Sequence, residues 1–300
     1  MSIKKINHQK LEKELIIKKK SCWETWDEKT KSKAFAFAEN YKKFLNSAKT
    51  ENEAVKTGEV IARKNGFKNI TDVKSVKAGD KVYFVQRDKS IIFARIGRKP
   101  LTGGVRVVMP HIDSPHLDFK VTPLYEDENI AFLKTHYYGG IKKYQWPTIA
   151  LALHGKVYLE NGKEVDVVIG EKDSDPVFMI TDLLPHLDRP GGGASDPKNR
   201  EVKGEDLNFV VGSLPVRDEK VKEKVKLAVL EYLYKEYKIK EEDLASAELQ
   251  AVPSEKARDL GFDRSMISGY GHDDRICSFS ALQGLIDIKN PDHTSLYILS

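Results

Sequence analysis

The period of the apolar residues changes along this chain, and the order of those changes restricts its fold more than any other feature. Over residues 23–64 apolar side chains recur at three- and four-residue steps, which predicts a helix. From Lys81 to Pro110 three apolar runs alternate with turn-forming residues, which predicts three strands. The middle is β-rich, with a hairpin signal at Asn161-Gly162 and then an amphipathic helix over 221–237. A strand, a helix and a strand follow.

An α/β pattern that stops and later resumes predicts an α/β domain interrupted by a second domain. We place the first part of the α/β domain at 1–121, the β-rich insert at 122–246 and the second part at 247–300. The final apolar run, TSLYILS, reads as a buried strand that ends the chain. We expect a C-terminal portion to be missing, and the strand to lack partners and to be an exposed, aggregation-prone edge.

Composition excludes several classes of protein. Apolar residues make up 40% of the chain, and no stretch has the eighteen or more apolar residues that span a bilayer. The N-terminus lacks an apolar signal core, and Cys22 and Cys277 form no disulfide framework, so we predict a cytoplasmic protein. The net charge is +5, but lysines are interleaved with acids, which argues against nucleic-acid binding.

A histidine and an aspartate directly follow the third predicted strand. The run VRVVMP leads into HIDSP, so His111 and Asp113 stand at a strand's carboxyl end, where open α/β sheets bind ligands. Alternate side chains of an extended segment share a face, so the two point the same way. A carboxylate there can orient a metal-bound imidazole. The alternative is an ordinary loop whose histidine is satisfied by its neighbours.

Two adjacent acids, Asp273 and Asp274, follow two glycines and precede an apolar helix. One acid at a helix start is explained by capping. The second allows another function, because one carboxylate can bridge two divalent ions in a co-catalytic metallohydrolase. Taken alone, these residues leave the cap and the metal bridge as open alternatives.

Four separated blocks together resemble the aspartyl aminopeptidase family of zinc peptidases. In order they are HIDSP, YGGIKKYQWPTIALALHGKVYL, PVFMITDLLPHLDR and GYGHDDRICSFSALQGLID, and the resemblance covers essentially the whole chain. It implies an α/β fold with a zinc-peptidase-type mixed sheet and flanking helices, interrupted by a β-rich dimerisation domain. It also implies a zinc ligand at His111, an orienting carboxylate at Asp113 and a bridging carboxylate at Asp273.

The resemblance further implies that His186, in LLPHL, reaches a neighbouring subunit's active site to bind substrate or to stabilise the developing oxyanion. The family's site also needs a Glu-Glu pair, a further aspartate and a late histidine, and none is identified up to Ser300. The remaining histidines are predicted to be structural: His8, His116, His136, His154, His272 and His293.

We therefore predict a zinc-dependent aminopeptidase that hydrolyses N-terminal residues from peptides, with two zinc ions per complete subunit. The inserted domain is predicted to mediate self-association into a homododecamer built from dimers, without nucleic-acid or membrane partners. The alternatives are a catalytically inert assembly or regulatory subunit and a related dinuclear-zinc carboxypeptidase or deacylase. The 300-residue chain itself is predicted to be inactive, because it holds no evident general base.

Overall fold

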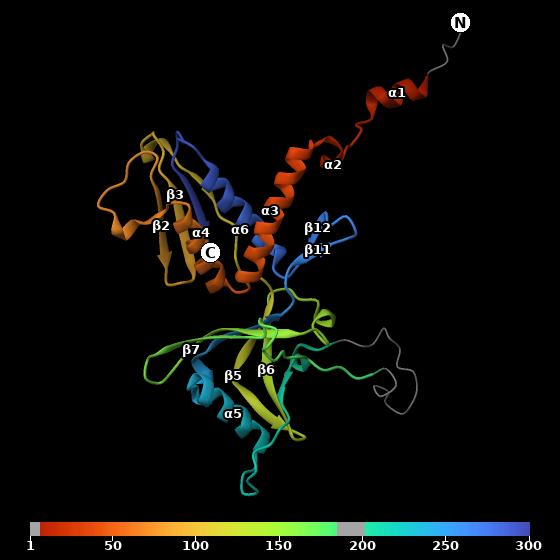
Figure 1. Cartoon of the computed structure of the whole chain (residues 1–300), viewed down its shortest axis with the longest axis vertical. Helices are drawn as coiled ribbons and strands as arrows, with labels where there is room; N and C mark the ends of the chain where they lie inside the picture. Colours follow the sequence, from red (N-terminus) through yellow and green to blue (C-terminus); the bar gives the residue numbers. More distant parts are fainter. Residues whose placement is uncertain (1–6, 185–201) are drawn as a thin grey trace. The chain divides into compact units, whose positions relative to one another are not determined.

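The structure, a computed structural model, describes residues 7–184 and 202–300 (Figure 1). It divides into two units, one that ends at Tyr41 and one that runs from Lys42 to Ser300. None of the described helices is both long and apolar enough to cross a membrane.

The first unit is helical. It contains α1 (His8–Leu15), the single turn α2 (Cys22–Thr25) and the start of α3 (Glu28–Ser47). Trp23 of α2 lies edge-on to Trp26, with ring centroids 5.4 Å apart. Apolar residues that follow a helical spacing here therefore pack partly against one another.

The single helix predicted over 23–64 is wrong, because the chain forms three helices there. α3 ends at Ser47 and α4 spans Glu51–Lys64. Thr50 starts α4: its hydroxyl accepts a hydrogen bond from the Glu53 amide at 3.3 Å, and the Glu53 carboxylate accepts one from the Thr50 amide at 3.1 Å. This reciprocal cap satisfies amides that a helix start leaves open, so a new helix begins in mid-pattern.

The first sheet has five strands in the order β1-β2-β3-β13-β4. β2, β3 and β13 are antiparallel neighbours, whereas β1 runs parallel to β2 and β4 runs parallel to β13. This is the predicted mixed sheet. The strands are β1 (Lys68–Asn69), β2 (Lys81–Gln86), β3 (Ser90–Arg95), β4 (Arg106–Val108) and β13 (Ser295–Leu299).

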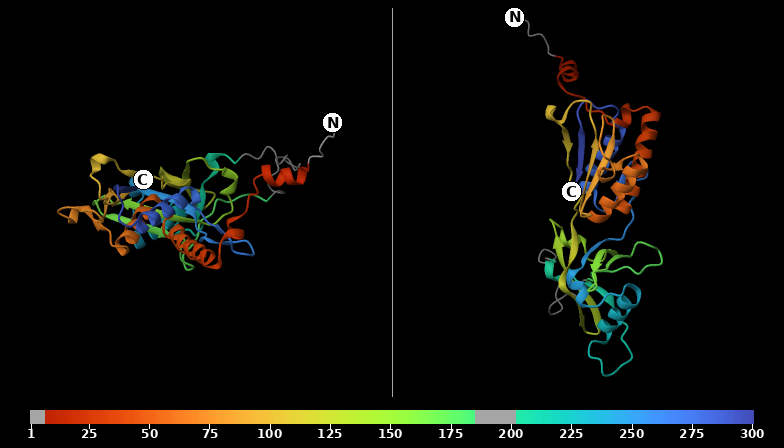
Figure 2. Two further views of the ribbon diagram at one scale, coloured as in Figure 1. Left: turned by 90° about the horizontal axis from the view of Figure 1, so that it is seen from above. Right: turned by 90° about the vertical axis from the view of Figure 1, so that its left-hand side faces the viewer.

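Two helices, α4 and α6 (His272–Asp287), pack on one face of this sheet (Figure 2). The Tyr297 hydroxyl of β13 donates a hydrogen bond to the Ser278 carbonyl of α6 at 2.7 Å. Two residues along, the Leu299 side chain lies beside Gly58 of α4, where an added Cβ would stand 3.6 Å away. Because alternate residues of a strand share a face, both helices cover the same side.

The expectation of an unpaired last strand is wrong. β13 lies between β3 and β4, and Tyr297 and Leu299 are each only 1% exposed. The chain returns into the interior of the sheet, which a linear reading of TSLYILS does not show. The apolar edge is instead β4, where Val107 is 52% and Val108 is 56% exposed.

The second sheet has six strands in the order β8-β7-β10-β5-β6-β9, and every neighbouring pair is antiparallel. The predicted hairpin is confirmed: β7 and β8 pair, and Gly162 between them has φ +79°, which favours glycine. The strands are β5 (His116–Asp127), β6 (Ile130–Tyr138), β7 (Leu151–Tyr158), β8 (Glu164–Ile169), β9 (Phe209–Gly212) and β10 (Glu248–Pro253).

Helix α5 (Lys224–Tyr237) packs against β5, β6 and β9 and closes an apolar core. The sheet takes its strands from His116 to Pro253, a slightly wider range than the insert placed at 122–246. Those domain limits remain a prediction. What matters for function is that β5 continues directly from the HIDSP loop and that β10 leads back toward the GYGHDDR loop.

Candidate metal centre

The HIDSP loop begins where two parallel strands end. β4 ends at Val108 and its neighbour β13 ends at Leu299, and the Ile112 amide donates a hydrogen bond to the Ser300 carbonyl at 3.1 Å. The loop therefore lies at the carboxyl edge of the sheet, the usual place for ligand binding in open α/β sheets.

His111 lies between two carboxylates. Its Nδ1 hydrogen-bonds to Asp113 Oδ1 at 2.9 Å, as the alternation of side chains predicts, and its Nε2 is 3.2 Å from Asp273 Oδ1. Two ligand atoms, each about 2 Å from one tetrahedral zinc ion, stand about 3.3 Å apart. An imidazole nitrogen and a carboxylate oxygen at this spacing fit two ligands of one ion.

The charges of the pair reinforce each other. Burial opposes protonation of His111, but the hydrogen bonds and charge of Asp113 outweigh burial and raise the pKa of the imidazole. Burial also opposes ionisation of Asp113, but hydrogen bonds from Tyr138 and then His111 outweigh it, so the pKa of Asp113 is lowered. Asp113 is therefore held as a carboxylate, which can only accept hydrogen bonds.

The two adjacent acids of the GYGHDDR loop point to different places. The Asp273 side chain is 89% exposed and reaches His111, whereas Asp274 Oδ1 accepts a hydrogen bond from the Cys277 amide at 3.4 Å in the first turn of α6. Both residues have non-helical backbone angles, and the peptide bond between them is cis. One acid thus serves the helix and the other is free for a ligand. The role of Asp273 as a metal bridge remains a proposal.

Arg275 joins the two loops, a contact that the sequence analysis missed. Its side chain is buried, with Nε donating to the Ala48 carbonyl at 2.8 Å and Nη2 to the Lys49 carbonyl at 3.2 Å. Nη1 hydrogen-bonds to the Ser114 hydroxyl, which donates to the Asp273 carbonyl at 2.7 Å. Burying a cation requires such partners. The sequence signal that could have revealed this contact is a charged residue inside an otherwise apolar helix pattern.

Tyr138, in the YGG block, is a second neighbour that the sequence analysis did not assign. Its hydroxyl donates a hydrogen bond to Asp113 Oδ2 at 2.9 Å, and this hydrogen bond, followed by the negative charge of Asp113, raises the pKa of the phenol. His116, predicted to be structural, is buried and stacks on the Tyr138 ring. His186 lies outside the described residues.

A cavity of about 500 Å³ lies beside Asp273. Its apolar wall comes from the segment after the YGG block and from the GYGHDDR loop, and Lys142 supplies a cation. Its volume is within the range of small-ligand pockets. Residues of the apolar wall include Ile141, Trp146, Ile149 and Tyr270.

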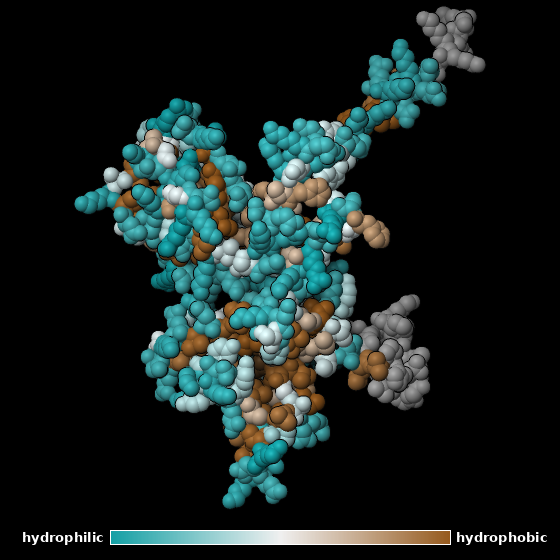
Figure 3. Space-filling model, in the orientation of Figure 1, coloured by the Kyte–Doolittle hydropathy of each residue, from teal (hydrophilic) through white to brown (hydrophobic). Residues whose placement is uncertain are grey.

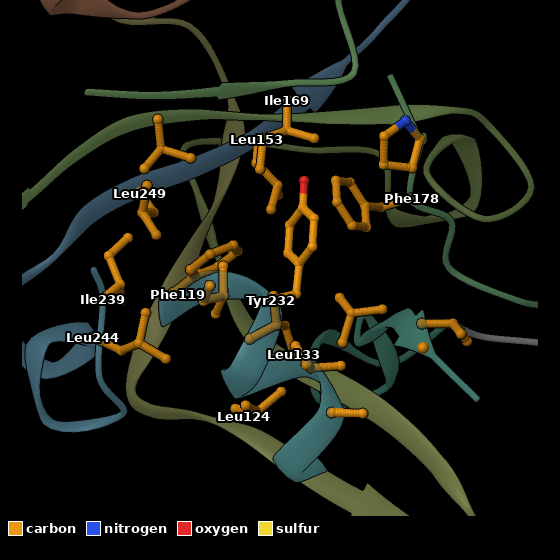
Figure 4. A pocket seen from close by; sticks show the side chains of 18 of the residues that line it. Phe119, Leu124, Leu133, Leu153, Ile169, Phe178, Tyr232, Ile239, Leu244 and Leu249 are labelled. Atoms are coloured by element: carbon orange, nitrogen blue, oxygen red, sulfur yellow. The ribbon is translucent and has the colours of Figure 1, made fainter. Parts of the chain in front are cut away.

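A second cavity, of about 540 Å³, lies between α5 and the six-stranded sheet (Figure 4). Aliphatic and aromatic side chains line it, and the Tyr232 side chain extends from α5 among Leu153 and Phe178. Of its described lining residues, Tyr232 alone can ionise in water. This lining offers no group for metal-assisted hydrolysis.

Within residues 7–184 and 202–300, no three His, Cys, Asp or Glu side chains gather in a way that would hold a metal ion. His111 and Asp273 can therefore form only part of a zinc site, since structural and catalytic zinc ions take three or four protein ligands. The donors present fit zinc in kind and spacing, and the set is incomplete in this part of the chain.

Comparison with known proteins identifies the family. Residues 44–299 match the family described as aminopeptidase I zinc metalloprotease (M18). The chain belongs to the M18 family. A probable M18 family aminopeptidase 1 of Clostridium acetobutylicum is 44% identical over 290 residues, which cover 95% of this chain and 62% of that relative.

Solved M18 structures agree. The crystal structure of an M18 aminopeptidase from Thermotoga maritima has a TM-score of 0.86 and 41% identity, over 95% of this chain and 61% of that one. Aminopeptidase I from Borrelia burgdorferi has a TM-score of 0.84 and 39% identity, over 93% of this chain and 64% of that one. The resemblance and the fold class predicted from sequence are confirmed. The chain spans about three-fifths of the length of these relatives.

Proposed function

We propose that an M18 protein of the relatives' full length, containing this chain, is a zinc-dependent aminopeptidase that hydrolyses N-terminal residues from peptides. The observation that carries the proposal is the 3.2 Å spacing between His111 Nε2 and Asp273 Oδ1 at the carboxyl edge of a mixed sheet. Membership of a zinc metalloprotease family supports the same activity.

Each side chain has a defined part in this proposal. Asp113 accepts a hydrogen bond from His111 Nδ1, which leaves Nε2 as the ligand atom. Asp273 presents an exposed carboxylate with two oxygens, so we propose that it bridges two zinc ions per complete subunit. Bound zinc supplies Lewis acidity toward the scissile carbonyl and toward water. The cavity beside Asp273 is proposed to receive the substrate's N-terminal residue.

We also propose that the protein self-associates through residues 122–246 into a homododecamer built from dimers, and that it acts in the cytoplasm. Hydrophobic side chains are visible on the surface of the part that holds the six-stranded sheet (Figure 3). Exposed apolar side chains in the range 122–246, among them Leu214 at 82% exposed and Val177 at 52%, support an interface. In such an assembly His186 would donate a hydrogen bond to the oxyanion that develops in a neighbouring subunit. The LLPHL block is the support for that role.

Two other functions fit the same fold less well. An inert assembly subunit does not need His111, Asp113 and Asp273 in ligand geometry, yet this chain keeps them together. A carboxypeptidase or deacylase is not favoured, because the similar M18 proteins are described as aminopeptidases.

The test uses the full-length protein with His111→Ala or Asp273→Ala. Each variant should lose at least one tightly bound zinc ion and the release of N-terminal residues from a peptide. Metal analysis and a peptide-release assay measure the two effects. His136→Ala, at an exposed histidine of β6, is the matched control and should retain both. If both site variants still bound two zinc ions tightly, the proposal would be contradicted.

A further inference from the structure

The YGG block has a physical link to His111 that begins with the pairing of two strands. His116 is the first residue of β5 and Tyr138 is the last of β6, and they are partners in the antiparallel register. Their rings stack with centroids 4.7 Å apart and planes 14° apart. The chain then turns at Gly139, whose φ of +75° favours glycine. The Tyr138 ring is thus fixed at the end of the HIDSP loop, where β5 begins.

His116, on which the Tyr138 ring stacks, is itself held in place by hydrogen bonds. His116 is 3% exposed, its Nδ1 hydrogen-bonds to the Ser114 carbonyl at 2.7 Å, and its Nε2 hydrogen-bonds to Asp118 Oδ1 at 3.0 Å. A ring bonded on both nitrogens cannot rotate without losing a contact. The phenol that rests on it therefore has a defined position, although Tyr138 is 41% exposed.

Asp113 is shared between Tyr138 and His111. Oδ2 accepts the hydrogen bond from the Tyr138 hydroxyl at 2.9 Å, and Oδ1 accepts the one from His111 Nδ1 at 2.9 Å. With both oxygens engaged, the carboxylate has one orientation. Asp273, on the other side of the imidazole, is 89% exposed and has no comparable anchor among its described contacts.

We propose that Tyr138 is a positioning residue for His111: by anchoring Asp113, it keeps the imidazole proton on Nδ1 and so leaves the Nε2 lone pair for a metal ion. The inference rests on the proposed metal-binding role of His111. An imidazole between two carboxylates can keep its proton on either nitrogen, and only one of the two choices is compatible with ligation through Nε2. The anchored carboxylate decides which form prevails.

The decisive experiment reads the tautomer directly and needs neither metal nor turnover. The chain is labelled with ¹⁵N-histidine, and long-range ¹H–¹⁵N correlation spectra are recorded at a pH where the imidazole is neutral. His111→Gln identifies the His111 signals by their loss. The wild-type chain should show the Nδ1-protonated form. In Tyr138→Phe, which keeps the stacked ring and removes only the hydroxyl, the preference for that form should fall about tenfold.

The matched control is Tyr144→Phe, at a tyrosine that is 66% exposed six residues further on. Its tautomer ratio should equal that of the wild type. Thermal unfolding of both variants checks that neither has lost its fold. An unchanged His111 tautomer in folded Tyr138→Phe would overturn the inference.

Zinc titration of the full-length protein gives a second readout. Tyr138→Phe should weaken the apparent affinity about tenfold, at the lower end of the range for partners of ligating histidines. Equal affinities of Tyr138→Phe and wild type would also count against the inference. If His111→Ala left zinc binding unchanged, the proposed function would be refuted, but the tautomer result would still hold. The failure of the inference and the failure of the proposed function are therefore distinguishable.

Discussion

His154 of β7 is a buried histidine between two carboxylates. Nδ1 hydrogen-bonds to Glu53 at 2.7 Å and Nε2 to Glu171 at 3.0 Å, while Lys49 forms an ion pair with Glu171 at 2.6 Å. The sequence analysis predicted this histidine to be structural, and its contacts join the first turn of α4 to the second sheet. The proton on His154 therefore stabilises the folded structure.

His154 should make stability depend on pH. Burial opposes its protonation, but hydrogen bonds and the charges of Glu171 and Glu53 outweigh burial and raise its pKa from 6.5 to about 9. A group whose pKa is raised on folding stabilises fully below its unfolded pKa and loses that effect as pH rises through the folded value. The free energy of unfolding should thus fall by about 1.4 kcal/mol per pH unit between these values.

The measurement is urea unfolding of the wild type, His154→Gln and His136→Gln at a series of pH values from 6 to 10. The stability difference between wild type and His154→Gln should shrink with rising pH by roughly 3 kcal/mol in total. His136→Gln, at an exposed site, should follow the wild type. A constant difference across the series would show that the buried proton is not linked to folding.

Among the elements, the edge strand β4 has an unusual surface. It pairs with β13 on one side, and Val107 and Val108 are more than half exposed. Natural edge strands are commonly protected by charge, because an open apolar edge is a template for pairing with another chain. Val107→Lys should therefore lower self-association of the isolated chain.

Light scattering measured as a function of protein concentration tests this prediction. Val60→Lys is the matched control, because Val60 is 50% exposed but lies on α4. Neither change should alter the free energy of unfolding by more than about 0.5 kcal/mol, as is usual for surface substitutions. If both lysine variants scatter as the wild type does, β4 is not the surface responsible.

Much of this architecture could be predicted from local patterns. The Asn161-Gly162 hairpin and the strands before HIDSP follow from residue spacing, because turns and alternation are local properties. The insertion of β13 between β3 and β4 could not be found that way, since strand order depends on contacts between distant segments. Tyr138 and Arg275 were missed for the same reason: their partners lie far away in the sequence.

At the scale of the whole molecule, the chain of 300 residues should release no N-terminal residues from peptides, even with zinc added. His111 Nε2 and Asp273 Oδ1 lie 3.2 Å apart, but within residues 7–184 and 202–300 no third metal-binding side chain joins them, and the sequence offers no evident general base. A peptidase assay against a full-length relative measures this. Zinc-restored turnover by the chain would contradict the prediction and would direct attention to Glu248 and Glu255.

The interior position of β13 also has a consequence for how this protein is made. β3 pairs with a strand that the ribosome adds roughly 200 residues later, since Arg95 is opposite Ser295. Until then β3 and β4 have open edges, while the six-stranded sheet can form from residues already synthesised. Among the described strands, all six of the second sheet are therefore synthesised before β13, and the facing edges of β3 and β4 stay unpaired until β13 emerges.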